Sequence, residues 1–118
     1  MPERIQRLRR RGWRMPSGAV YVGRPTQWGN PWTVSDARSW GIEPARWRQW
    51  LVTQFREEAK HLGLLSDHNI RLHEGDSTYA DHVRRHLAGK DLVCWCPPGQ
   101  PCHADVLLEI ANGRAVAG

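Results

Sequence analysis

The stretch Asp91-Leu92-Val93-Cys94-Trp95-Cys96-Pro97-Pro98-Gly99-Gln100-Pro101-Cys102-His103 decides how we expect this chain to fold. Its first five residues are mostly apolar and predict a buried strand. The prolines and the glycine that follow cannot continue a strand, so they predict a turn. Cys102 and His103 then begin a helix that runs to about Ala111 and ends at Asn112-Gly113. This order of strand, turn and helix is typical of an α/β protein.

The sequence on the amino-terminal side supplies the other expected elements. Residues 19–22 are apolar strand formers closed by Gly23, and they predict a second buried strand. Helical spacing predicts one helix over residues 43–62 and another that starts at residue 77 or 78 and ends near Gly89. We therefore expect a small single α/β domain, with a short and mainly parallel sheet flanked by about three helices.

The expected domain covers residues 18–113, because the two ends of the chain differ from it in composition. Residues 1–17 read as a basic N-terminal arm with some helical potential, and residues 114–118 read as a flexible tail. Six arginines precede residue 15, and the net charge of the whole chain is +5. Such a run is typical of contacts with phosphate or nucleic acid, although a solvated arm has the same composition.

The cysteines and the histidine of the opening stretch allow three interpretations. On a strand Cys94 and Cys96 project to one face, and the turn brings Cys102 and His103 back toward them. Cys94, Cys96, Cys102 and His103 would then be a tetrahedral Zn2+ site. Alternatively, Cys102 is a nucleophilic thiol activated by the helix N-terminus, with His103 as its catalytic partner. In the third interpretation the cysteines are core residues and His103 only donates a hydrogen bond at the helix start.

Residues 23–32 contain two glycines and two prolines in ten positions and predict an ordered loop. Gly23 and Gly29 would permit close approach of a ligand, and Arg24 would clamp a phosphate or carboxylate. Asn30 would form hydrogen bonds with polar edges of a ligand, and Trp28 or Trp32 would stack on a base or sugar. If the two strands are parallel neighbours, this loop and the cysteine turn meet at one end of the sheet.

The same loop has a purely structural interpretation. In this interpretation the tryptophan side chains fill the hydrophobic core, a role that fits Trp32 better than Trp28. Arg24 then forms an ion pair with an acidic residue. The two interpretations differ in whether Arg24 and Cys102 lie on one face of the molecule or on opposite faces.

The composition, and the lack of a recognisable membrane span or signal peptide, predict a cytoplasmic protein. No stretch approaches the roughly 18 apolar residues of a membrane span, and the basic N-terminus lacks the apolar region of a signal peptide. Three cysteines within nine positions fit a reducing compartment better than a disulfide framework.

Several segments resemble the domain-of-unknown-function family 4326 of bacteria and their phages. They are Arg4-Ile5-Gln6-Arg7, Gly12-Trp13-Arg14, Val20-Tyr21-Val22-Gly23-Arg24-Pro25, Trp28-Gly29-Asn30-Pro31 and the segment from Leu92 through Cys102-His103 to Leu107. The cysteine–histidine segment is also similar to a motif of domain-of-unknown-function family 488, which implies an α/β fold with a polar site. Neither resemblance implies a particular activity.

Two functions follow from these residues as expectations. The first is a small α/β protein, an enzyme or a binding protein, that binds a nucleotide, nucleoside or modified base beside a Cys/His site. The alternative is a zinc-stabilised module that binds nucleic acid through its arginine arm and exposed tryptophans, without catalysis.

Overall fold

The computed structural model describes residues 2–60, 70–72, 75–76 and 78–113. A three-stranded sheet contains β1 (Arg4–Gln6), β2 (Val20–Tyr21) and β3 (Leu92–Cys94). The helices are α1 (Val34–Ser39), α2 (Trp47–Ala59), α4 (Tyr79–Leu87) and α5 (His103–Ala111), with a 3-10 turn η1 (Pro44–Arg46) leading into α2. The chain is thus a small α/β domain, as the sequence predicted.

The sheet has the order β1-β3-β2, and β3 pairs with both neighbours in parallel. Val22 N donates to Val93 O at 2.9 Å, and Arg7 N donates to Cys94 O at 2.6 Å. The prediction of a short parallel sheet is confirmed, and the two strands expected from the sequence, β2 and β3, are parallel neighbours. Since all three strands point the same way, the Gly23–Trp32 loop and the cysteine turn leave the same end of the sheet.

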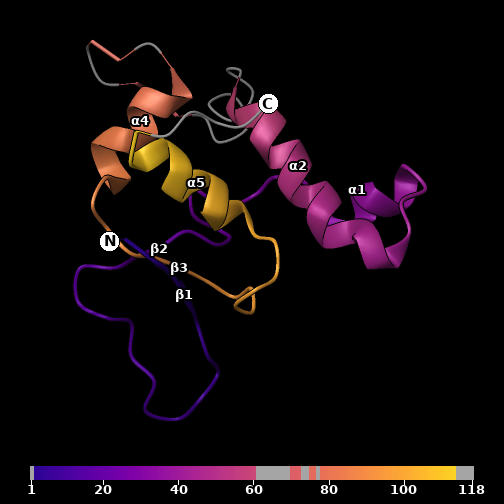
Figure 1. Cartoon of the computed structure of the whole chain (residues 1–118), viewed down its shortest axis with the longest axis horizontal. Coiled ribbons are helices and arrows are strands. Elements are labelled where there is room, and N and C mark those ends of the chain that lie inside the picture. Colours follow the sequence, from indigo (N-terminus) through magenta and orange to yellow (C-terminus); the bar gives the residue numbers. More distant parts are fainter. Residues whose placement is uncertain (1, 61–69, 73–74, 77, 114–118) are drawn as a thin grey trace.

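Strand β1 lies within the segment, residues 1–17, that the sequence analysis described as a basic N-terminal arm. Arg4–Gln6 forms an edge strand, with Ile5 opposite Val93. The strand is only three residues long, too short to produce an apolar alternation that a sequence pattern could reveal. Residues 7–19 form a long excursion from the sheet rather than a helix (Figure 1).

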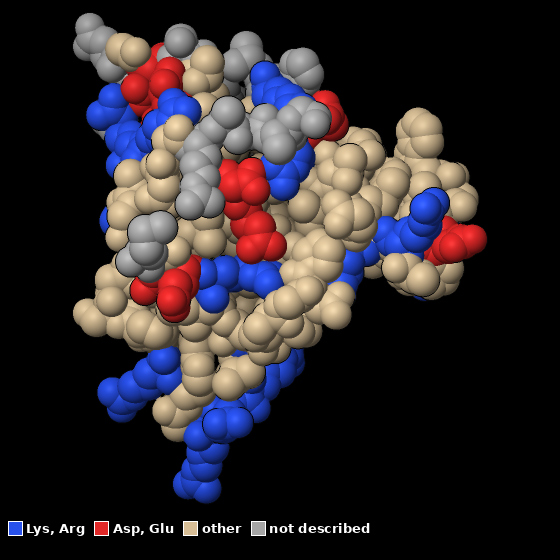
Figure 2. Space-filling view, viewed as in Figure 1, with Lys and Arg blue, Asp and Glu red and all other residues tan. Residues whose placement is uncertain are grey.

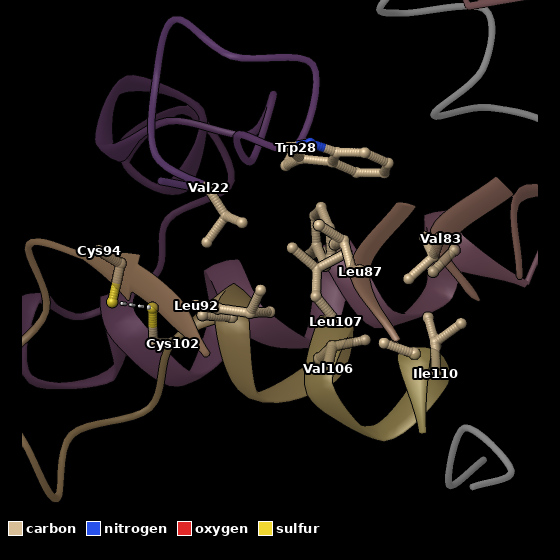
Figure 3. Packing of buried hydrophobic residues seen from close by; sticks show 14 of the residues in the cluster. Val22, Trp28, Val83, Leu87, Leu92, Cys94, Cys102, Val106, Leu107 and Ile110 are labelled. Atoms are coloured by element: carbon tan, nitrogen blue, oxygen red, sulfur yellow. Dashed lines mark hydrogen bonds between the residues drawn. The ribbon is translucent and has the colours of Figure 1, made fainter. Parts of the chain in front are cut away.

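Helix α5 organises the core. It lies between α2 and α4 over the sheet and contacts both helices as well as β1 and β3 (Figure 1). Val106, Leu107 and Ile110 on its inner face are buried against Leu92 of β3 and Leu87 of α4 (Figure 3). The positions three and four apart on α5 supply the apolar stripe that this packing requires.

Local signals explain where the helices begin. The Thr78 hydroxyl accepts a hydrogen bond from Asp81 N and starts α4 at the predicted place. Helix α1 was not predicted, although Thr33 and Asp36 form a capping box whose spacing the sequence displays. Helix α2 follows the 3-10 turn at Pro44; its predicted end at 60–63 falls partly outside the described residues, as does the predicted tail.

Charge is distributed unevenly over the surface. The end of the molecule formed by residues 7–19 carries arginine side chains with no acidic side chain among them, whereas basic and acidic side chains are mixed around the helices (Figure 2). Within the described residues, no helix is both long and apolar enough to cross a lipid bilayer.

Candidate functional site

A cavity of about 370 Å³ lies where the Gly23–Trp32 loop faces the cysteine turn. It therefore sits at the carboxyl ends of β2 and β3, where open α/β sheets bind their ligands. The loop, α2, the cysteine turn and the start of α5 all contribute to its wall. The lining residues are Tyr21, Gly23, Arg24, Asn30, Trp32, Arg48, Leu51, Val52, Cys94, Trp95, Cys96, Pro101, Cys102 and His103.

The structure brings the two predicted halves of the site together. Arg24 and Cys102 line the same cavity, so the arrangement with these residues on opposite faces does not occur. This outcome depends on the parallel pairing of β2 and β3, which the sequence could suggest but not establish.

Arg24 and Asn30 hold the loop itself in shape. The Arg24 Nε donates to Asn30 O at 2.9 Å, and its Nη2 donates to Trp32 O at 2.6 Å. The Asn30 Nδ2 donates to Leu51 O of α2 at 2.9 Å, while its Oδ1 accepts from Trp32 N at 3.0 Å. Both side chains therefore donate hydrogen bonds to backbone carbonyls. The partners observed for Arg24 are these carbonyls and not the acidic residue of the structural interpretation.

Trp28 occupies the core rather than the cavity wall. It is buried against Tyr79 and His82 of α4, with ring centroids 6.4 and 5.1 Å away (Figure 3 shows Trp28 above Leu87). Trp32, which the sequence suggested as the core plug, is half-buried and lines the cavity. Trp32 is thus the tryptophan placed to stack on a ligand, whereas Trp28 and not Trp32 fills the core.

The two loop glycines also differ. Gly23 lines the cavity, and the Tyr21 ring covers it so closely that a Cβ there would lie 2.6 Å from Tyr21 Cζ. Gly29 packs against the Arg24 backbone, where a Cβ would lie 3.2 Å from Arg24 N, and it lies away from the cavity. Gly29 therefore serves loop packing.

The three cysteines form a compact cluster. The Sγ atoms of Cys94, Cys96 and Cys102 all lie within 4.8 Å of one another, and those of Cys94 and Cys102 are 3.4 Å apart (Figure 3). Cys94 ends β3, and Cys102 is the N-cap residue of α5, so the cluster joins strand to helix. Three cysteines in this arrangement could hold a metal ion.

His103 lies beside this cluster with a defined orientation. Its Nε2 lies 2.7 Å from Val22 O, and because a carbonyl only accepts, Nε2 carries a proton. Its Nδ1 faces Cys102 Sγ at 3.7 Å. With the proton on Nε2, the Nδ1 lone pair is directed at Cys102, where it can accept from the thiol or bind a cation. Metal-ligating histidines commonly show this pattern of one nitrogen bonded to a carbonyl.

Without a metal, the negative charge of the cluster is concentrated on Cys102. Hydrogen bonds from the Cys94 and Cys96 thiols, with a further contribution from His103, lower the pKa of Cys102 far below its usual range. The same hydrogen bonds to Cys102 raise the pKa of Cys94 and of Cys96, so these two keep their protons. A Cys102 thiolate that accepts from two thiols is a cation ligand, and a thiolate is also a nucleophile.

Arg4 is one of the residues of this region, with Tyr21, Arg48 and Trp95, that sequence reasoning did not assign to the site. Its Nη2 donates to Pro97 O at 3.2 Å and to Gln100 O at 2.9 Å, which fixes the cysteine turn. Its Nε lies 3.3 Å from the Asp105 carboxylate, and its side chain is 12% exposed. Burial alone would lower the Arg4 pKa, but a hydrogen bond to Cys102 and the Asp105 charge raise it. A buried cation thus compensates the charge of the cluster.

Comparison with known proteins gives a family but no activity. The family model described as "Domain of unknown function (DUF4326)" matches residues 5–113. Neither the curated proteins nor the solved structures contain a significant match to this chain.

Proposed function

The chain belongs to the DUF4326 family, and we propose that it binds a nucleoside or nucleotide in the cavity between the Gly23–Trp32 loop and a zinc ion held by the cysteine turn. The observation that carries this proposal is the shared cavity, in which a thiolate cluster faces a loop with aromatic and basic neighbours. Small-ligand sites typically enclose about 300 to 1,000 Å³, and this cavity lies within that range.

The spacing of the donor atoms supports zinc. With bonds of about 2.3 Å to sulfur and 2.0 Å to nitrogen, a tetrahedral zinc site separates two sulfurs by about 3.8 Å, and sulfur from nitrogen by about 3.5 Å. Cys94 and Cys102 are 3.4 Å apart, and Cys102 and His103 Nδ1 are 3.7 Å apart. Cys94, Cys96 and Cys102 would hold the ion. His103 Nδ1 lies near Cys102 but not within 4.8 Å of all three sulfurs, so the His103 ring would have to move to become the fourth ligand. A bound zinc ion would supply Lewis acidity at the wall of the cavity.

The remaining wall suits a base attached to a charged group. Tyr21, Trp32 and Trp95 offer aromatic surface, on which bases of any kind can stack. Arg48 is exposed and belongs to α2, so its guanidinium is placed to meet a phosphate at the rim. We assign the phosphate contact to Arg48 because Arg24 is engaged within its own loop. Catalysis by Cys102 and His103 stays a prediction.

Elemental analysis of purified protein tests the metal. We expect about one zinc per chain in the wild type and almost none in Cys96→Ser, whose side chain is half-buried and tolerates the change better than Cys94 or Cys102. Gln100→Ala, an exposed substitution in the same turn, is the matched control and should retain the metal. Folded wild type that remains metal-free after zinc titration would exclude the metal site.

Thermal shift with a panel of nucleosides and nucleotides tests the ligand. We expect at least one to raise Tm in the wild type, and the shift to disappear in Trp32→Ala. Trp40→Ala is the control, because Trp40 is 70% exposed and lies outside the cavity wall. The proposal fails if no nucleoside or nucleotide shifts Tm in zinc-loaded protein, or if both variants respond like the wild type.

A further inference from the structure

We propose that the physiological ligand of the cavity is single-stranded nucleic acid, with one base in the cavity and the adjoining phosphates along the arginine loop formed by residues 7–14. This inference rests on the proposed function and specifies its ligand. It also joins the two functions that the sequence left as alternatives, because side chains of the basic segment contact side chains that line the cavity.

Cation–π contacts connect the arginine loop to the cavity. The Arg7 guanidinium carbon lies 4.8 Å from the Tyr21 ring centroid and 5.0 Å from that of Trp95, and the Arg9 carbon lies 4.9 Å from that of Trp95. Tyr21 and Trp95 both line the cavity, and Trp95 is 39% exposed. The positive surface therefore begins at the rim of the cavity, without a gap between the two.

The charges of this loop are free to meet a polyanion. Residues 7–14 contain five arginines and no acid, and all five arginines are exposed. None of the five takes part in an ion pair within the described part of the chain, whereas Arg56, Arg84 and Arg85 all do. Figure 2 shows this end of the molecule as basic side chains without acidic neighbours. The arginines of the loop thus differ from those that stabilise the helices.

The backbone holds the loop in place beside the site. Arg7 N donates to Cys94 O at 2.6 Å, which ties the start of the loop to the end of β3 and to the first cysteine. A turn closed by Trp13 N to Arg10 O at 3.0 Å, with Gly12 at φ 83°, folds the loop tip. The arginines are therefore presented in a fixed relation to the cavity, as a track for phosphates requires.

The geometry favours a single strand over a duplex. The cavity encloses about 370 Å³, and its walls combine aromatic surfaces with polar groups. This size and lining suit one unpaired base. In a duplex that base would be stacked and paired, and moving it into the cavity would cost free energy. Proteins that bind single strands commonly combine a basic track with aromatic stacking surfaces.

Fluorescence anisotropy with labelled oligonucleotides tests the inference. Zinc-loaded full-length protein is titrated with a 12-nucleotide single strand and with the duplex of the same sequence, at several salt concentrations. The loop variant is Arg10→Ala/Arg11→Ala. The control is Arg38→Ala/Lys90→Ala, which removes the same charge from exposed positions elsewhere. Binding of the best mononucleotide is measured in parallel for both variants.

We expect tighter binding of the single strand than of the duplex. The loop variant should lose about tenfold or more in affinity, and the slope of log K against log salt should fall by up to about 2. The control should bind nearly as the wild type does, and mononucleotide binding should be unchanged in both. Equal losses in the two variants, or equal affinity for the single strand and the duplex, would overturn the inference.

The two proposals fail in distinguishable ways. If the mononucleotide binds but the loop variant keeps full oligonucleotide affinity, the inference is wrong and the proposed function stands. If no mononucleotide binds, while oligonucleotides bind through the loop and are unaffected by Trp32→Ala, the cavity is not the base site and both are wrong.

Discussion

Arg24 shows how a residue type can indicate the right region and the wrong role. Arginine beside a glycine-rich turn suggested a phosphate clamp, and Arg24 does line the cavity. Its donors instead hold the carbonyls of Asn30 and Trp32. A sequence contains no information on which acceptor a side chain will reach first, and in a tight loop the backbone carbonyls are closest.

Arg24→Ala should therefore lower stability as well as ligand binding. Two hydrogen bonds from a charged group to carbonyls are lost, which we expect to reduce the free energy of unfolding by about 1 to 2 kcal/mol. Nucleosides and nucleotides should lose affinity to the same extent, because the loop and not a phosphate contact is damaged. Urea unfolding and calorimetric titration check this. Unchanged stability with a loss restricted to nucleotides would instead restore the phosphate role.

Tyr79 gives a residue-scale prediction outside the site. Its hydroxyl is buried and has no hydrogen-bond partner among the described residues, and burial raises its pKa above the usual 10.0. Tyr79→Phe should leave stability unchanged or raise it by about 1 kcal/mol at pH 7, because an unpaired buried hydroxyl is unfavourable.

The pH dependence of this variant has a definite sign. Since the folded-state pKa is raised, the unfolded chain loses the Tyr79 proton first, and the stability of the wild type should fall as pH rises above about 10. Tyr79→Phe lacks this contribution, so its advantage should grow over that range in thermal unfolding. A constant difference between the two proteins from pH 7 to 11 would contradict the burial of Tyr79.

Among the helices and strands, those with a clear hydrophobic periodicity or a capping residue could be predicted from the sequence, whereas the three-residue strand β1 could not. The buried strand at β3, the helix α4 and the apolar stripe of α5 follow from periodicity and caps, and the structure has them at the expected places. The three residues of β1 carry one apolar side chain and pair only because β3 offers an open edge. Such pairing is a tertiary effect that local sequence does not encode.

The site was predicted in part for the same reason. Cys94, Cys96 and Cys102 are near one another along the chain, so a strand and a turn were enough to bring them together. Arg4 reaches the cluster from β1, about 90 residues away, and Trp32 and Arg48 reach the cavity through the packing of α2. Predicting these contacts requires the sheet order and the helix packing.

Gly23→Ala tests whether the close packing of Tyr21 on Gly23 shapes the loop of residues 23–32. An alanine Cβ would overlap the Tyr21 ring, whose hydroxyl donates to Arg24 O at 3.0 Å, so Tyr21 must leave its place on the cavity wall. We expect a loss of about 1 to 3 kcal/mol in stability and weaker ligand binding. The clash disappears in a Tyr21→Ala background, where Gly23→Ala should cost little. Additive effects of the two substitutions would show that they do not interact.

At the scale of the whole molecule, the start of α5 is the point where the three strands are joined to the helices. Cys94 comes from β3, Arg4 comes from β1, and His103 reaches back to Val22 at the end of β2. A zinc ion on the cysteines would add bonds at this junction, where the described residues already contribute apolar packing, hydrogen bonds and the ion pair of Arg4 with Asp105. Such an ion would stabilise the whole domain, because it binds only when the strand and the helix are in place.

Removal of metal should therefore lower the thermal stability of the entire chain. We expect a zinc chelator to reduce Tm of the wild type by at least about 5 °C, which corresponds to roughly 1 kcal/mol in a domain of this size. Cys96→Ser should start from the lower Tm and show no further response to the chelator, whereas Gln100→Ala should respond as the wild type does. Scanning calorimetry with and without chelator measures these differences. If the wild type loses its zinc and keeps its Tm, the ion does not join the sheet to α5, and hydrogen bonds such as those of Arg4 are sufficient to hold that junction.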